Sequence, residues 1–148
     1  MKSLSIGFSS SMKYLSIKIV FIGLLSGCVG VSHKNNSEAM YIQASALTKL
    51  SKAVEVTVRY ENPPANLSDE ELLKLSTTDD PGLLDPFDGY TLKINRDFNH
   101  AIVLVCSSDG TQGLLEDAGC TADLDNPLWK QTMPCAFTLS SETTCFNK

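Results

Sequence analysis

The chain has 148 residues, of which 43% are hydrophobic and 20% are charged; this length and balance fit one globular domain and exclude wholesale disorder. Residues 1–27 carry three of the 12 basic residues and none of the 17 acidic ones, so the remaining nine basic and 17 acidic residues give a formal net charge of −8. Such an acidic domain lacks the cationic face that nucleic acids require, which excludes them as the expected partner and favours a basic partner if charge steers binding.

The first 27 residues have the order of regions of a secretory signal peptide. Two lysines precede a short apolar core at residues 19–25, and two small residues follow it. The apolar core is far shorter than the ~20 residues that span a bilayer, so we expect no permanent transmembrane helix here. Because the segment is complete from Met12 onward, the sequence leaves both Met1 and Met12 open as the start.

The tetrapeptide Leu25-Ser26-Gly27-Cys28 matches the lipobox of bacterial lipoproteins at all four positions. The N-terminal segment therefore resembles that family, in which the cysteine receives a diacylglyceryl group, the peptide is cut just before it, and the new N-terminus is acylated. The resemblance implies that Cys28 is the lipid-bearing first residue of the mature chain. Val29 stands where an aspartate would retain a lipoprotein at the inner membrane, which implies an outer-membrane address facing the periplasm.

Residues 29–37 contain glycine, serine and asparagine without an apolar period, which predicts a flexible tether that includes His33. We therefore divide the chain into a signal peptide at 1–27, a lipidated cysteine and tether at 28–37, and one extracytoplasmic domain at 38–148. The membrane is the first expected partner, through a lipid anchor that becomes stable with two or three acyl chains.

The domain begins with a segment, residues 38–62, that admits two interpretations. Apolar residues recur at helical spacing, which predicts one long amphipathic helix. From Val54 to Tyr60, however, apolar and polar residues alternate as in a half-buried strand. No turn signal separates the two patterns, so we expect the helix to continue through about Tyr60 and to end at Asn62-Pro63-Pro64.

Two short helices are expected next. Ser68-Asp69-Glu70-Glu71 has the pattern of a capping box, in which the serine and the second glutamate bond reciprocally to each other's backbone amides. Asp80-Pro81 is a second, weaker signal for the start of a helix, with the aspartate as N-cap and proline at the first helical position.

The second half of the chain is rich in strand patterns. Residues 90–94 and 101–106 are expected to be strands, with the turn formers of residues 95–100 between them. The second strand is almost wholly apolar, which predicts a central strand covered on both faces. Residues 113–120 fit a strand or a helical turn, and residues 135–140 a last strand. Helices followed by a small antiparallel sheet predict an α+β fold.

Once Cys28 is assigned to lipid, an even set of four cysteines remains: Cys106, Cys120, Cys135 and Cys145. Export to an oxidising compartment predicts two disulfides, each worth about 3 kcal/mol. Of the three possible pairings, short loops favour Cys106–Cys120 with Cys135–Cys145, although the sequence does not decide among them. We expect no metal site, because there is no Cys-x-x-Cys and the histidines lack ligand spacing.

Catalytic motifs are absent from the sequence, so we expect neither an enzyme nor a cofactor. His100 falls in the predicted turn and is expected on the surface. Acidic residues near position 120 are expected in a solvated loop, and Trp129 as a core residue or, if exposed, a binding anchor. Together they are the first candidate for a partner surface: Glu116, Asp117, Asp123, Asp125 and Trp129.

These observations predict a small membrane-anchored lipoprotein that is not an enzyme and that binds another protein in the cell envelope. The alternative is an inhibitor or immunity-type lipoprotein directed against a basic enzyme such as lysozyme, suggested by the charge of −8. Known lysozyme inhibitors of this size are mostly β, whereas this chain opens with a helical pattern. A third interpretation is a hydrolase that uses the acids between residues 116 and 125.

Overall fold

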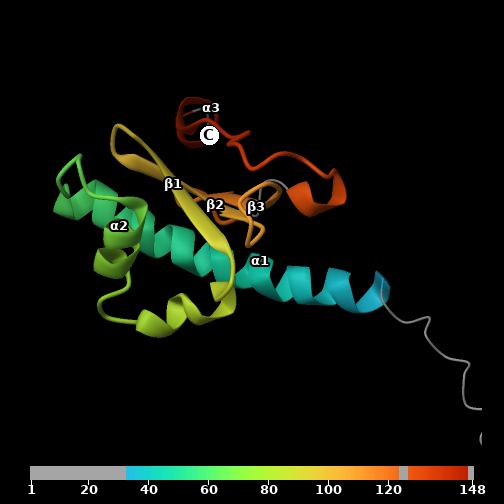
Figure 1. Ribbon diagram of the computed structural model, residues 1–148. Helices are drawn as coiled ribbons and strands as arrows, with labels where there is room; N and C mark the ends of the chain where they lie inside the picture. Colours follow the sequence, from blue (N-terminus) through green and yellow to red (C-terminus); the bar gives the residue numbers. More distant parts are fainter. Residues whose placement is uncertain (1–32, 124–126, 147–148) are drawn as a thin grey trace, which may run out of the picture. The chain divides into compact units, whose positions relative to one another are not determined.

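The computed structural model describes residues 33–123 and 127–146, and Asn36–Lys148 form one compact unit. Its elements in chain order are α1 (His33–Val56), η1 (Thr57–Glu61), α2 (Asp69–Ser76), η2 (Pro81–Leu83), η3 (Asp85–Phe87), β1 (Thr91–Asp97), β2 (His100–Cys106), β3 (Gly113–Ala118), η4 (Leu128–Lys130) and α3 (Ser141–Cys145). Within the described residues, helices precede a three-stranded antiparallel sheet (Figure 1). The predicted α+β fold is therefore confirmed.

The helical interpretation of residues 54–60 is correct. A strand would place Val54, Val56 and Val58 on the same face. In the structure Val54 and Val58 are buried whereas Val56 is 41% exposed, as helical spacing requires. The last turn widens into the π-helical η1 and ends at Asn62, which is left-handed with φ 48°. The helix α1 begins at His33, inside the range 28–37 that we expected to be tether.

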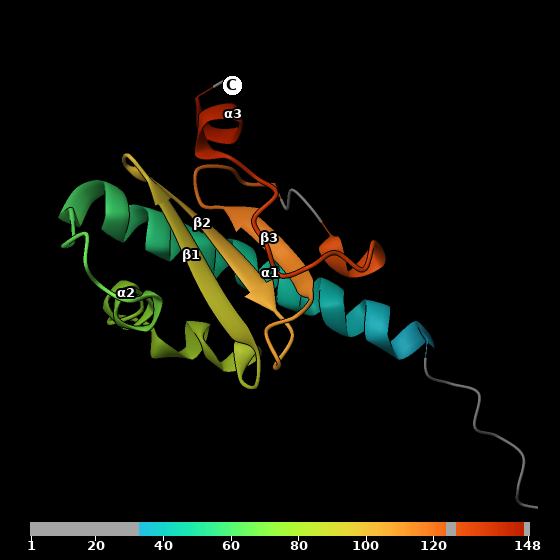
Figure 2. The ribbon, with the colours of Figure 1, turned by 45° about the horizontal axis from the view of Figure 1, so that its top comes forward.

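The sheet has the order β1-β2-β3, and the central strand β2 is buried along its whole length. Alternate residues of β2 face opposite sides. Ala101, Val103 and Val105 join the core formed with α1, while Leu104 and Cys106 pack with Leu128. Figure 2 shows α1 on one face of the sheet and the C-terminal segment on the other. The predicted central strand with two covered faces is thus confirmed.

Two expectations about strand extent need correction. The turn between β1 and β2 is only Phe98-Asn99, because Asp97 already pairs with His100. Residues 135–140 are not a strand of the sheet. The Cys135 amide donates to the Thr111 carbonyl, but the amides of Thr138 and Leu139 donate to the carboxylate of Glu116. Residues 138 and 139 therefore lie against the sheet through a side chain, and the segment forms no continuous backbone ladder. Residues 113–118, by contrast, form the strand β3.

The capping box of α2 is present as predicted. The Ser68 hydroxyl accepts from the Glu71 amide at 3.3 Å, and the Ser68 amide donates to the Glu71 carboxylate at 2.8 Å. The η2 turn does begin with Pro81, but the side chain of Asp80 makes no capping hydrogen bond.

The four cysteines form two disulfides, Cys106–Cys135 and Cys120–Cys145. The short-loop pairing that we favoured is wrong, and the antiparallel sheet explains why. Cys106 ends β2 and lies beside Gly113 at the start of β3, whereas Cys120 follows the far end of β3. At about 3.3 Å per residue, β3 separates the two cysteines by roughly 20 Å, so each bonds the C-terminal segment at its own end of the sheet.

Candidate functional site

The turn between β1 and β2 carries an exposed aromatic side chain in an unfavourable backbone conformation. Phe98 has φ 53°, and 82% of it is exposed. In a two-residue hairpin turn with positive φ at the first position only, glycine is the favoured residue there. A phenylalanine at this position gains little burial within the chain and adopts a conformation that costs about 1 kcal/mol or more.

Phe98 belongs to a hollowed surface at the same end of the sheet. A groove of about 730 Å³ is lined by Arg59, Phe98, Asn99, His100, Glu142 and Phe146. Phe146 is itself 55% exposed, and its ring meets that of Phe98 edge to face at 6.4 Å between centroids. We call Arg59, Phe98, Asn99, Glu142 and Phe146 the Phe98 face; it combines two exposed aromatic rings with one cation and one carboxylate.

Beneath the Phe98 face lies a buried polar pair. The Nδ1 atom of His100 is 2.7 Å from Oε1 of Glu55 on α1, and the other carboxylate oxygen of Glu55 accepts from the Ala101 amide at 2.8 Å. His100 is only 8% exposed, so its expected surface position is wrong. Because the turn is just two residues long, His100 starts β2 and is covered by α1 and by the ring of Phe146, 4.8 Å away.

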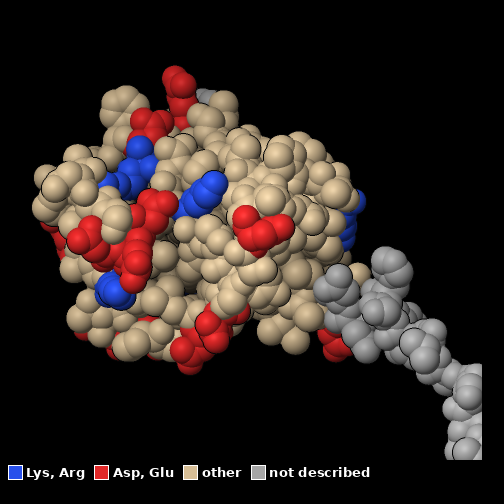
Figure 3. All heavy atoms as spheres, viewed as in Figure 1, with Lys and Arg blue, Asp and Glu red and all other residues tan. Residues whose placement is uncertain are grey.

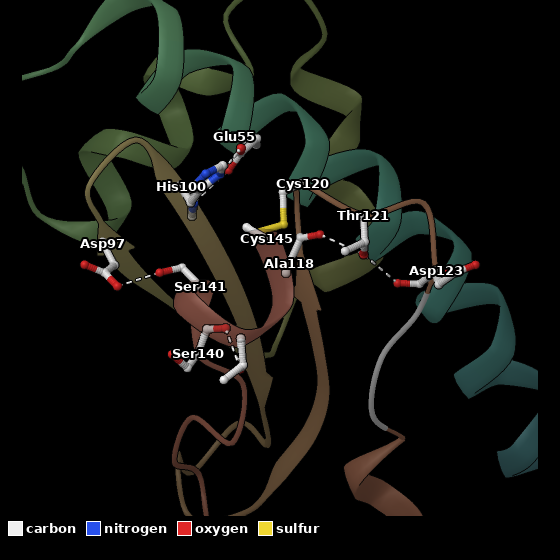
Figure 4. The surroundings of a disulfide bond; sticks show 12 residues. Glu55, Asp97, His100, Ala118, Cys120, Thr121, Asp123, Ser140, Ser141 and Cys145 are labelled. Atoms are coloured by element: carbon white, nitrogen blue, oxygen red, sulfur yellow. Dashed lines mark hydrogen bonds and ion pairs between the residues drawn. A yellow bond between two sulfur atoms is a disulfide. The ribbon is translucent and has the colours of Figure 1, made fainter. Parts of the chain in front are cut away.

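The disulfide Cys120–Cys145 adjoins His100 (Figure 4). One ring nitrogen of His100 and the two sulfur atoms lie within 4.8 Å of one another. The Ser141 hydroxyl at the start of α3 donates to the Asp97 carboxylate at 2.5 Å. These contacts fix α3, and with it Phe146, against the β1–β2 turn.

Two of the acids that we predicted in a solvated loop, Glu116 and Asp117, are instead part of the strand β3 and are buried. Glu116 and Asp117 are both 0% exposed, so their assignment to a partner surface is wrong. Successive strand residues point to opposite faces. Glu116 accepts from the Thr138 amide and hydroxyl on the side of the C-terminal segment, while Asp117 accepts from the Ser51 hydroxyl on α1. These carboxylates join the layers of the fold.

The remaining members of that predicted surface are Asp123, Asp125 and Trp129. Asp123 is exposed, and Asp125 lies outside the described residues. Trp129 is partly buried, packs against the main core and meets Tyr41 edge to face at 5.6 Å. Its interpretation as a core residue is therefore the better one.

An exposed acidic surface does exist, but on a different segment. Residues 69–88 contain seven acids and a single base, Lys74, and all seven acids are exposed. Figure 3 shows acidic side chains on the side of the molecule where α2 lies. Hydrogen bonds from Ser68 lower the pKa of Glu71, and the Glu70 carboxylate, 2.8 Å from Lys74, raises the pKa of that amine. A count of charges along the sequence would have found this segment.

Comparison of the chain with protein-family models, curated proteins and solved structures gave no match. Of the helices that the structure describes, none is both long and apolar enough to cross a bilayer. Cys28 lies outside the described residues, so the lipobox stays a prediction from sequence. Function must therefore be argued from the chemistry of the surface itself.

Proposed function

We propose that this chain is a lipid-anchored protein of the bacterial cell envelope that acts without catalysis by binding another protein, and that the Phe98 face is its contact surface. The observation that carries the proposal is Phe98 itself, 82% exposed and left-handed at φ 53°. Neither burial nor backbone preference within the chain favours phenylalanine at that position. Contact with a partner would provide the missing favourable energy.

The chemistry of the face supports a protein partner. Exposed aromatic side chains that lie together mark interaction sites, and aromatic residues and arginine dominate the energetics of protein interfaces. Phe98 and Phe146 provide the apolar part, and Arg59 and Glu142, which also line the groove, add a cation and a carboxylate. A partner that inserts an apolar side chain between these groups fits this surface best.

Photo-crosslinking in cells tests the contact surface. A photoreactive amino acid replaces Asn99, which is exposed beside Phe98, and in a matched control it replaces Ser108, which is exposed in the turn between β2 and β3. We expect a discrete crosslinked protein from position 99 that is missing from position 108 and is lost when Phe98→Gly is added. The same products from both positions, unchanged by Phe98→Gly, would contradict the proposal.

The lipid anchor needs a separate test, because its prediction depends on the lipobox sequence alone. Cys28→Ala removes the only thiol that could receive the diacylglyceryl group within residues 1–32, so we expect the protein to leave the membrane fraction. Cys28 should also account for incorporation of labelled fatty acid. If Cys28→Ala stays with membranes and still takes up the label, the anchor is elsewhere.

A second candidate, inhibition of a basic enzyme such as lysozyme, is favoured by the seven exposed acids of residues 69–88. Such a surface would attract a cationic enzyme, and salt would weaken the attraction. Titration of lysozyme with the full chain in detergent at low salt distinguishes the candidates. Undiminished lysozyme activity excludes this enzyme as the target, whereas inhibition that survives Phe98→Gly would favour the acidic segment over the Phe98 face.

A further inference from the structure

We propose that Cys120, Cys145 and His100 form a zinc site when a dithiol reduces their disulfide. The proposal rests on the side chains around Cys120–Cys145 and does not depend on the proposed function. Among the described residues, this is where a histidine nitrogen and two cysteine sulfurs lie within 4.8 Å of one another. Two thiolates and one imidazole are a ligand set that zinc binds well.

The distances require only small movements. With Zn–S bonds near 2.3 Å and Zn–N bonds near 2.0 Å, neighbouring ligand atoms of a tetrahedral site lie about 3.5–3.8 Å apart. Once the S–S bond is broken, the sulfurs of Cys120 and Cys145 separate to that distance, and the histidine nitrogen approaches them by about 1.3 Å or less. A water molecule would complete the four ligands.

Glu55 positions the histidine for this role. Metal-binding histidines usually hold their second ring nitrogen against a carboxylate or carbonyl oxygen, which fixes the tautomer and the ring orientation. Nδ1 of His100 is 2.7 Å from the Glu55 carboxylate, and Glu55 is itself held by the Ala101 amide. This contact leaves Nε2 of His100 for the metal.

Access distinguishes this disulfide from the other one. Cys120 and Cys145 are both partly exposed, whereas in the other disulfide only Cys135 is partly exposed and Cys106 is fully buried in an apolar cluster with Leu104 and Leu128. A dithiol can therefore approach Cys120–Cys145 from either cysteine, but the other disulfide only from Cys135. The exchange turns the dithiol into its cyclic disulfide and gives the protein two thiols, and the two thiol protons are released when zinc binds the thiolates.

The test uses the full chain in detergent, reduced by a dithiol that is removed before metal is added, with Co²⁺ as a spectroscopic probe for zinc. We expect thiolate-to-cobalt charge-transfer bands from the reduced chain and from Cys106→Ser/Cys135→Ser, with loss of the bands in Cys120→Ser/Cys145→Ser. Bands that survive this last double substitution, or that are missing from the reduced wild type, would overturn the proposal.

Two further measurements remain informative even if reduction or substitution of the cysteines unfolds the chain. Glu55→Gln should keep the bands but weaken zinc binding by about 10–100-fold, because the orienting carboxylate is lost. Zinc should also raise the melting temperature of the reduced chain, or restore its helical circular dichroism if reduction unfolds it, and should leave the oxidised chain unchanged. Zinc that does neither would show that the disulfide is structural only. A Glu55→Gln chain that binds zinc with full affinity would overturn the positioning role of Glu55.

Discussion

Acidic side chains in two regions of this molecule have opposite surroundings. On β3, Glu116 and Asp117 are fully buried, and their carboxylates accept hydrogen bonds from the C-terminal segment and from α1. In residues 69–88 the acids are all exposed, and those with partners bond locally, as Glu71 does with Ser68. The same carboxylate chemistry therefore serves two purposes. Where the acid lies in the fold decides whether it links the sheet to α1 and the C-terminal segment or lies on the solvent-exposed surface.

The largest difference in the free energy of unfolding should come from removing one buried acid of β3 and, separately, one exposed acid of residues 69–88. Glu116→Ala leaves the donors of Thr138 and Leu139 without their acceptor inside the fold, so we expect the free energy of unfolding to fall by about 3 kcal/mol or more. Asp88→Ala, on the exposed segment, should change it by less than about 0.5 kcal/mol. Urea unfolding measures both, and equal losses would contradict the assignment of the two regions.

Gly→Ala substitutions compare the stability of the same two regions without a change of charge. A Cβ atom at Gly119, just after β3, would lie 2.2 Å from the Ser51 carbonyl oxygen of α1. Gly119→Ala should therefore cost about 1–3 kcal/mol. At Gly82, in the exposed acidic segment, the nearest atom would be 3.4 Å away, so Gly82→Ala should be neutral or stabilise by up to about 1 kcal/mol. Thermal unfolding of both variants would reveal whether α1 and β3 approach as closely as described.

The smallest effect concerns pH. Hydrogen bonds from Ser68 hold the pKa of Glu71 below its usual value of 4.5. The ionised carboxylate therefore stabilises the fold at all pH values above the usual pKa, and this contribution is lost as the pH falls through the lowered pKa. The stability difference between wild type and Glu71→Gln should shrink over that acidic range. A difference that is independent of pH would mean that the charge of Glu71 contributes nothing.

Much of the fold could be predicted from the sequence because its signals are local. Helical spacing to Tyr60, the Ser68–Glu71 capping box and the apolar β2 strand each depend on a few neighbouring residues, and each is present. The α+β order and the formation of two disulfides followed from the same patterns together with the cysteine count.

The remaining features depend on contacts between distant residues. The disulfide pairing follows from which ends of β2 and β3 meet, and loop length carries no information about that. Glu116 looked like a surface residue because its hydrogen-bond donors, on residues 138 and 139, are more than 20 residues away. Phe98 was missed because its importance lies in a backbone angle and an exposed fraction, which appear only once the two-residue turn is known.

The central claim, that the Phe98 face binds a protein, is tested most directly by the affinity of the full chain for the partner crosslinked from position 99. Phe98→Gly removes the ring and suits the left-handed turn, so the melting temperature should stay nearly unchanged. The account predicts that the dissociation constant rises by about 30-fold or more, the effect of losing an interface hot spot. An unchanged dissociation constant in this stably folded variant would contradict it.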